Sequence, residues 1–339
     1  SIPAIIGMTI TSLYNIIDSL FVAKIGEDAI TALSLVYPVQ NLINALAIGF
    51  GVGINAVISY HLGAGEIDKA DAAATRGIAC SVVHGVVSMI VCITVMPRFL
   101  RLFTDSEQVA EMGTQYASIA FAFSVIIMVG LAFEKIYQAM GRMQVTMTAL
   151  LFGCVTNIVL DPLFIFALNM GVRGAALATI ISQCLSCVWV LRFLTGPKTM
   201  LRLKKENIRI APALVLPCVA LGSATFIMQA SESVISMCFN SSLLKYGGDI
   251  AVGAMTILSS VMQFAMLPLQ GIGQGAQPII SYNYGARNTE RVRRTFWLLL
   301  RVSLCYSVLL WAIIQLFPGV FARMFTPKAE LIDFTVTAL

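Results

Sequence analysis

The sequence predicts an all-α polytopic membrane protein, and its composition, its long apolar spans and an internal repeat all point to this fold class. Hydrophobic residues make up 58% of the chain and charged residues 12%, with a mean hydropathy of +0.86. A soluble domain carries roughly 25% charged residues. The composition therefore excludes a water-soluble globule and predicts several helices that cross a lipid bilayer.

Apolar spans long enough to cross about 30 Å of hydrocarbon recur along the chain. A tenth span begins near residue 329 and stops at Leu339, and Ser1 already lies inside an apolar segment, so we expect a chain truncated at both ends. The nine complete or nearly complete spans are predicted at 3–22, 31–61, 77–97, 114–138, 143–168, 174–196, 211–244, 251–282 and 295–318.

The connections between spans are short, with one exception. Turn signals such as Gly141 and Gly247 to Asp249 mark the short loops, whereas Arg192 to Arg209 carries Gly196, Pro197 and a run of charges. We interpret the long connection as a linker between two bundles. The predicted domains are an N-terminal bundle at 1–196, a cytoplasmic linker at 197–210 and an incomplete C-terminal bundle at 211–339.

The charges of the loops predict the orientation of the chain. Loops after even-numbered spans, including a pair counted at Lys135 and Arg142, hold 15 Lys and Arg residues, and loops after odd-numbered spans hold 7. Basic loops stay in the cytoplasm, so the first span runs from inside to outside. The net charge of +5 lies in these loops without interleaved aromatic residues, which favours the anionic lipid surface over nucleic acid as a partner.

An internal repeat appears at an offset of 222 residues. Gly49 to Gly65 aligns with Gly271 to Arg287, with eight of seventeen positions identical. Six spans separate the two copies, so both have the same orientation. Parallel repeats of this kind are typical of transporters that handle their substrate between two bundles, and we expect about ten of the twelve helices of two six-helix bundles in this chain.

Polar side chains at similar depth mark a candidate ion site in the first bundle. Asn157 and Asp161 are four residues apart and share a helical face, and Pro162 leaves the carbonyl of Ile158 without its helical donor. Asp18 and Thr179 lie in two other spans, and we place both aspartates and the threonine roughly 7–10 Å below the outer boundary. A carboxylate inside a membrane is costly and usually functional.

The ligand set suits either of two ions. Carboxylate, amide and hydroxyl oxygens are hard ligands that fit Na⁺. Two buried carboxylates close together cannot both stay ionised cheaply, so the set suits H⁺ equally well. The alternatives are structural: Asp18 snorkels to the interface, Asp161 ends its helix before Pro162, and the Thr179 hydroxyl bonds to its own backbone.

Several motifs resemble those of the multidrug and toxic compound extrusion (MATE) transporters, over essentially the whole chain. They are IPAIIGM and LYNIIDSLFVAKIG in the first span, QAMGR at 138–142, NIVLDPLFI at 157–165, GVRGAALAT at 171–179 and PLQGIGQGAQPIISYNYGA at 268–286. The resemblance implies twelve helices in two bundles, a V-shaped central cleft, and export of organic cations in exchange for H⁺ or Na⁺. It also implies that Asp18, Asn157, Asp161 and Thr179 form the amino-terminal cation site.

Further candidates lie outside this set. Glu232 resembles an acid that some members of the family use in their second bundle, although a packing role beside Gln229 or Ser236 is an equal alternative. Tyr37, Gln40 and Gln263 are candidates for the lining of a substrate cleft. The GxGxG patterns at Gly49 and Gly271 lie in long apolar spans with no preceding strand, so we interpret them as helix-packing positions and not as a nucleotide loop.

The expected function is secondary active antiport in the plasma membrane of a bacterium, by a monomer that carries small organic cations. We expect no cofactor beyond the coupling ion, no nucleic acid and no enzyme activity, because no catalytic set stands at workable positions. The eight cysteines are predicted to be free thiols. The rivals are a flippase for lipid-linked oligosaccharides, which would need several cationic side chains in its cleft, a membrane-embedded enzyme and a non-transporting sensor.

Overall fold

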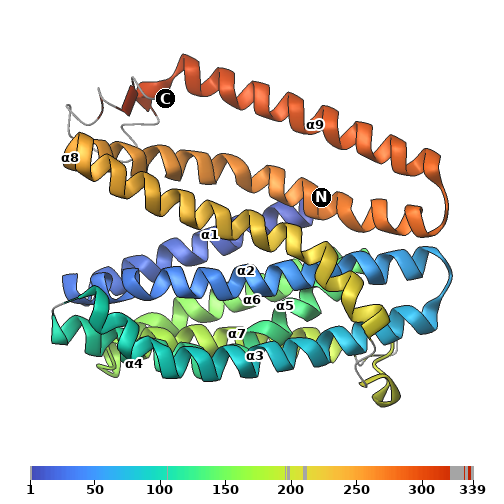
Figure 1. The fold of residues 1–339 in the computed structure, drawn as a ribbon, viewed down its shortest axis with the longest axis horizontal. Coiled ribbons are helices and arrows are strands. Elements are labelled where there is room, and N and C mark those ends of the chain that lie inside the picture. Colours follow the sequence, from blue (N-terminus) through green and yellow to red (C-terminus); the bar gives the residue numbers. More distant parts are fainter. Residues whose placement is uncertain are drawn as a thin grey trace.

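The computed structural model consists of helices, and Figure 1 shows most of them with their axes roughly aligned. The structure describes residues 2–104, 106–194, 196, 199–208, 212–320, 332 and 335–336, with side chains left out at 23, 205 and parts of 212–264. The elements are α1 (Ile2–Ala23), α2 (Glu27–Gly63), α3 (Ile67–Phe103), α4 (Glu107–Ala122), α5 (Ser124–Ala139), α6 (Met143–Pro162), the π-helical turn η1 (Leu163–Ala167), α7 (Val172–Leu194), the 3₁₀ turn η2 (Lys205–Ile208), α8 (Pro212–Gly285) and α9 (Thr289–Leu316).

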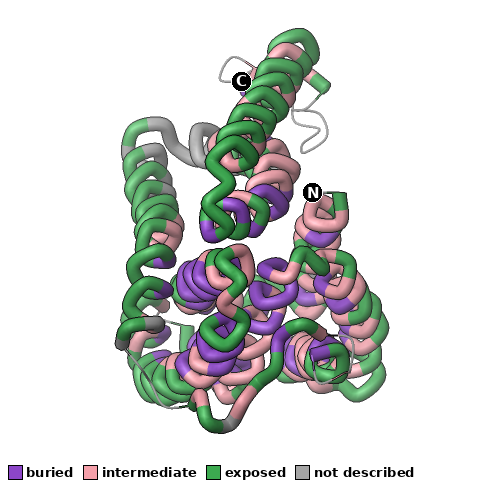
Figure 2. The backbone as a smooth tube through the Cα atoms, turned by 90° about the vertical axis from the view of Figure 1, so that its right-hand side faces the viewer, coloured by how far each residue is buried: buried purple, intermediate pink, exposed green. Residues whose placement is uncertain are grey.

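The helices confirm the predicted all-α polytopic fold. Seven helices are long and apolar enough to cross a membrane, and the count rises to eight if the bent pair α4 and α5 forms one span. The described residues contain no strand. Figure 2 shows buried positions gathered inside the helix cluster and exposed positions around it, and α9 buries none of its described residues, as expected of a surface that faces lipid or further protein.

The structure differs from the predicted spans in two places. The span 114–138 is broken at Phe123 into α4 and α5, which are bent by 50°. The Ser124 hydroxyl donates to the Phe121 carbonyl oxygen over 2.8 Å, and such local bonds compete with the helical ladder. The spans 211–244 and 251–282 form two limbs of one helical element, α8, which meet at the left of Figure 1, and the predicted turn at 247–249 falls between the limbs.

The tenth predicted span falls almost wholly outside the described residues. At 329–339 the structure describes only residues 332, 335 and 336. The division of the chain into two bundles and a linker stays a prediction.

Two apolar cores hold the first seven helices together. One core is built around Ile54, Ile58, Ile136 and Tyr137 where α2, α3, α5 and α7 meet. The other is built around Val36, Met96 and Leu100 with residues of α4 and α7. Because α2 contributes to both cores, it is the central helix of this cluster.

The linker docks on the first bundle. Leu201 is fully buried in the first core. The Arg202 backbone N–H donates to Asp71 Oδ1 over 2.8 Å, and the Lys204 backbone N–H donates to Thr75 Oγ1 over 3.3 Å. Lys204 Nζ lies 2.8 Å from Asp68 Oδ1, and this ion pair raises the pKa of the lysine above its usual value. The start of α3 thus fixes residues 201–204 in place.

The hairpin between α2 and α3 carries a small charge cluster. Glu66 accepts from Lys69 Nζ over 2.8 Å and lies 2.7 Å from His61 Nδ1. These two partners, Lys69 before His61, hold the pKa of the exposed Glu66 carboxyl below its ordinary value. The cluster orders the polar end of the hairpin on the side that the positive-inside rule assigns to the cytoplasm.

Lys135, which the charge count placed in a loop, lies inside α5 with only 4% of its side chain exposed. Its ammonium group donates to Gln138 Oε1 over 3.1 Å and lies 3.5 Å from Glu134 Oε1. The prediction of a loop position rests on the charge of Lys135 alone, and this criterion fails for a charged residue that is buried in an ion pair. Removing this residue from the loop count leaves the charge bias unchanged in direction.

Candidate ion-coupling site

The structure brings together the four residues predicted to form the ion site, from α1, α6 and α7. α6 packs against both α1 and α7. Asn157 and Asp161 are fully buried on one face of α6, and Asn157 Nδ2 donates to Asp161 Oδ1 over 3.1 Å. The Asp18 carboxyl group is in contact with that of Asp161. Asp18 of α1 therefore lies close to Asp161 of α6, and Thr179 of α7 lies beside Tyr14 of α1.

Each of the four residues presents one buried oxygen that forms no hydrogen bond with the described residues. These oxygens are Asp18 Oδ1, Asn157 Oδ1, Asp161 Oδ2 and Thr179 Oγ1. Buried polar atoms are nearly always paired, so these oxygens mark the cluster as a candidate site for a proton, a cation or water.

The geometry also bears on the structural alternatives. Asp18 does not snorkel, because its Oδ1 is buried. α6 ends at Pro162 as the proline rule predicts, but the chain continues directly into the π-helical turn η1, so Asp161 stays inside a helical span of 25 residues. Thr179 does not bond to its own backbone, whereas Ser182 one turn later donates to the Ala178 carbonyl oxygen over 2.7 Å.

Two tyrosines that the sequence reasoning missed lie at the site. Tyr14 lies beside Thr179 and Asp18, and the buried Tyr116 of α4 lies close to both aspartates. Tyr14 precedes Asp18 by one helical turn, so its spacing could have identified it. Tyr116 could not be found in this way, because only the packing of α4 brings it near.

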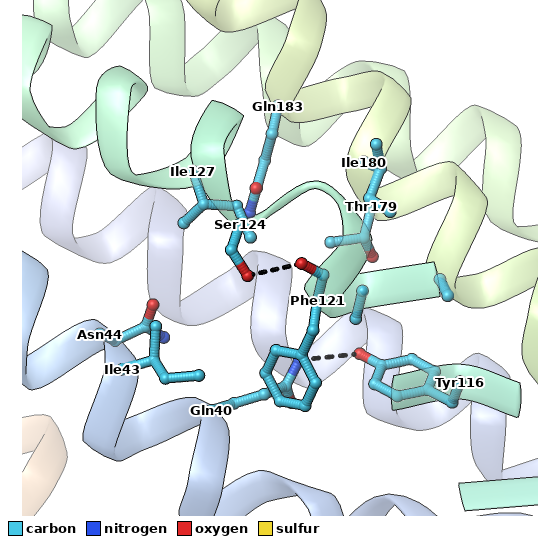
Figure 3. Close-up of a pocket in the computed structure, with 12 residues that line it drawn as sticks. Gln40, Ile43, Asn44, Tyr116, Phe121, Ser124, Ile127, Thr179, Ile180 and Gln183 are labelled. Atoms are coloured by element: carbon cyan, nitrogen blue, oxygen red, sulfur yellow. Dashed lines mark hydrogen bonds between the residues drawn. The ribbon is translucent and has the colours of Figure 1, made fainter. Parts of the chain in front are cut away.

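A small cavity adjoins the site through Thr179. Its volume is about 80 Å³, room for a few water molecules. Figure 3 shows polar groups of Gln40, Asn44, Ser124, Thr179 and Gln183 around it, and Gln40 Nε2 lies 3.5 Å from the Tyr116 hydroxyl. The cavity lies at the bend between α4 and α5, because Phe121, Ser124 and Ile127 form part of its wall.

The remaining candidates do not join this cluster. Glu232 is exposed on the first limb of α8, and Gln263 is exposed on the second. Tyr37 is 54% exposed, and only Gln40 lines the cavity. The structure describes no group of three or more His, Cys, Asp or Glu residues that could hold a metal, so a metal ion at the four-residue cluster would depend on neutral oxygens as well as the two acids. All eight cysteines are free, as predicted.

Comparison with known proteins decides the family. The MatE family model matches residues 3–163 and 224–339. The chain belongs to the MatE family of transporters. It is a multi-pass protein of the plasma membrane. Asp18, Asn157 and Asp161 lie within the first matched range, and Thr179 lies between the two matched ranges.

Individual relatives agree with the family model. The multidrug export protein MepA of Staphylococcus haemolyticus (strain JCSC1435) is 26% identical over 326 residues, which cover 94% of this chain and 72% of that protein. MepA of Staphylococcus aureus (strain NCTC 8325 / PS 47) is 24% identical over 287 residues, 84% of this chain and 63% of that protein. The chain thus spans about two thirds of the length of these relatives.

A solved structure shares the fold. It is described as the outward-facing conformation of a multidrug resistance MATE family transporter of the MOP superfamily. This chain matches it with a TM-score of 0.91 and 26% identity, over 99% of this chain and 75% of the other. The helical architecture described above is therefore that of the family.

Proposed function

We propose that this protein is a secondary active antiporter that exports organic cations in exchange for H⁺ or Na⁺ by alternating access. Family membership and the names of the relatives, multidrug export proteins, support a transporter of organic compounds and speak against an enzyme. The observation that carries the coupling assignment is the set of four unpaired buried oxygens at Asp18, Asn157, Asp161 and Thr179.

The proposed coupling rests on electrostatics. Two contacting carboxylates repel each other when both are ionised, and a proton or a sodium ion between them removes this repulsion. Ion entry from outside would let α1 pack more closely on α6, and ion release to the cytoplasm would reverse the change. Coupling needs only that ion and drug prefer different conformations by about 1–3 kcal/mol.

The flippase alternative receives less support. A lipid pyrophosphate would require cationic side chains that are free to bind it. The buried Lys135 is already paired with Glu134 and Gln138. We therefore keep the proposal of an exporter of small organic cations that is active as a monomer.

The deciding experiment uses the full-length protein in proteoliposomes. Efflux of a fluorescent organic cation is measured with an imposed pH gradient and, separately, with an imposed Na⁺ gradient. The proposal expects efflux with one gradient, and its loss in Asp18→Asn and Asp161→Asn but not in the exposed control Asp28→Asn. If the two site variants still expel the dye against its gradient, the coupling assignment is wrong.

A further inference from the structure

α2 and the second limb of α8 cross with backbone contact near their cytoplasmic ends. A Cβ atom at Gly63 would overlap the carbonyl oxygen of Tyr282, and a Cβ atom at Gly285 would overlap the carbonyl oxygen of Tyr60. The rings of Tyr60 and Tyr284 lie beside this contact, with centroids 6.1 Å apart. Only glycine lets the two backbones approach this closely.

The contact is reciprocal under the internal repeat. The offset of 222 residues places Tyr60 on Tyr282 and Gly63 on Gly285. Gly63 therefore contacts Tyr282, and Gly285 contacts Tyr60, which the repeat aligns with Tyr282. The contact has the symmetry of the isologous interface of a two-fold dimer. We call these four residues the reciprocal crossing. It marks the axis that relates the two halves of the chain.

Further contacts lie about two to three helical turns farther along α2 and α8, toward the middle of the membrane. Gln138 Nε2 lies 3.4 Å from Gln274 Oε1, and Gln277 Nε2 donates to the Val52 carbonyl oxygen over 3.1 Å. A Cβ atom at Gly53 would overlap the carbonyl oxygen of Cys218 in the first limb of α8. Both limbs of α8 are thus closed against the cytoplasmic half of α2.

One face of the outer half of α2 is exposed among the described residues, although Ala29, Ala32 and Val36 are buried. Tyr37 is 54% exposed and Leu42 52%, whereas Ile54 and Ile58 are fully buried. Figure 1 shows α2 lying along α8, with the hairpins that follow Gly63 and Gly285 at the same end of the molecule. The described backbone contacts between α2 and α8 thus lie in the half of α2 that ends at Gly63.

We propose that the reciprocal crossing is the cytoplasmic closure of the transporter and sets its equilibrium between outward-open and inward-open states. This inference rests on the proposed transport function, because it assigns a conformational role within alternating access. A methyl group added at Gly63 or Gly285 cannot be accommodated without separating the helices. Alanine at either position therefore shifts the population toward the cytoplasm-open state.

A native cysteine reports the opening. Cys218 is 3% exposed and lies under Gly53, so it is protected while the closure holds. Cys92 is 7% exposed and lies in the second core, away from α8. Full-length protein in detergent micelles, where both faces are accessible, is treated with a water-soluble maleimide, and the modified peptides are quantified by mass spectrometry.

The expected result is a rise of about 5- to 30-fold in the alkylation rate of Cys218 in both Gly63→Ala and Gly285→Ala, with Cys92 unchanged. Gly130→Ala and Gly273→Ala are the matched controls. Both are helical glycines whose added Cβ would meet no atom within 4 Å, and the second lies on α8 itself. Neither control changes the rate.

Other outcomes overturn the proposal. Equal labelling of Cys218 in crossing variants and controls contradicts it, and so does a parallel rise at Cys92, which marks general loosening. Gln274→Leu removes the hydrogen bond with Gln138 and adds no bulk at the crossing. We expect it to raise the alkylation rate of Cys218 about 2- to 10-fold. Since labelling needs neither drug nor ion gradient, its result is independent of the efflux assay that tests the proposed function.

Discussion

Two polar clusters lie inside the same helix bundle, and they differ in whether their charges are paired. At Glu134, Lys135 and Gln138 the carboxylate has an ammonium group and an amide as partners. At Asp18 and Asp161 two carboxylates meet, and each has an oxygen without a partner in the described chain. The first cluster is electrically complete within the protein, whereas the second, in our proposal, is completed by an ion from outside. Burial alone therefore does not distinguish the two clusters, and the pairing of their charges does.

The largest expected effect comes from neutralising the incomplete cluster. Asp161→Asn should reduce gradient-driven dye efflux to the level of vesicles without protein, because the cluster then has one carboxylate and no repulsion for an ion to relieve. Its thermal stability in detergent should stay equal or rise, since a buried charge has been removed. Loss of efflux together with loss of stability would mean that Asp161 is structural. Asp28→Asn serves as the exposed control.

The opposite pattern is expected at the complete cluster. Glu134→Gln leaves the Lys135 ammonium group buried without a counter-charge and should cost about 3 kcal/mol of unfolding free energy. The double variant Glu134→Gln with Lys135→Met should recover most of this loss, because no charge remains. Denaturant titrations of the purified variants measure both values. A double variant as unstable as the single one would show that the ion pair is not what stabilises this region.

A smaller effect is expected at Asn157. Its amide donates to Asp161 Oδ1, and its own Oδ1 is one of the four unpaired oxygens. Asn157→Leu removes both groups and should raise the half-saturating concentration of the coupling ion about tenfold. Efflux rates across a series of ion concentrations measure the shift. An unchanged value would remove the amide from the ligand set.

The smallest effect is expected at Thr179. Thr179→Val keeps the shape of the side chain and removes a neutral oxygen only, so the half-saturating ion concentration should rise about 3- to 5-fold. Thr179→Ser should restore the wild-type value, since it keeps the hydroxyl group. If valine has no effect and serine does, packing rather than coordination explains the position.

Much of the fold and of the candidate site follows from periodicity and depth. The spacing of Asn157 and Asp161 predicts a shared face, and the depth of Asp18 and Thr179 in their spans predicts that they meet it. These inferences need only the rise of a helix and the thickness of a bilayer. The structure brings the four residues together in this way, while their role as an ion site stays a prediction.

Other features depend on tertiary contacts that no local pattern encodes. The bend at Phe123 occurs without proline or glycine, so the sequence predicts one straight span. The sequence predicts a loop position for Lys135, because its burial depends on contacts with Glu134 and Gln138 and on the space above Gly51, where its side chain packs. The sequence shows the reciprocal crossing only as a repeat. The contact between the two copies depends on how α2 and α8 pack, which the repeat does not specify.

The docked linker has a consequence for how the two halves stay together. Because residues 201–204 are fixed on α3, only the short stretch from Lys204 to Pro212 joins them to α8, and it can span at most roughly 27 Å. A tether this short keeps the halves at a high effective concentration, of millimolar order. If the crossing opens as proposed, its contacts can be individually weak and still re-form, and the tether limits how far the two halves separate.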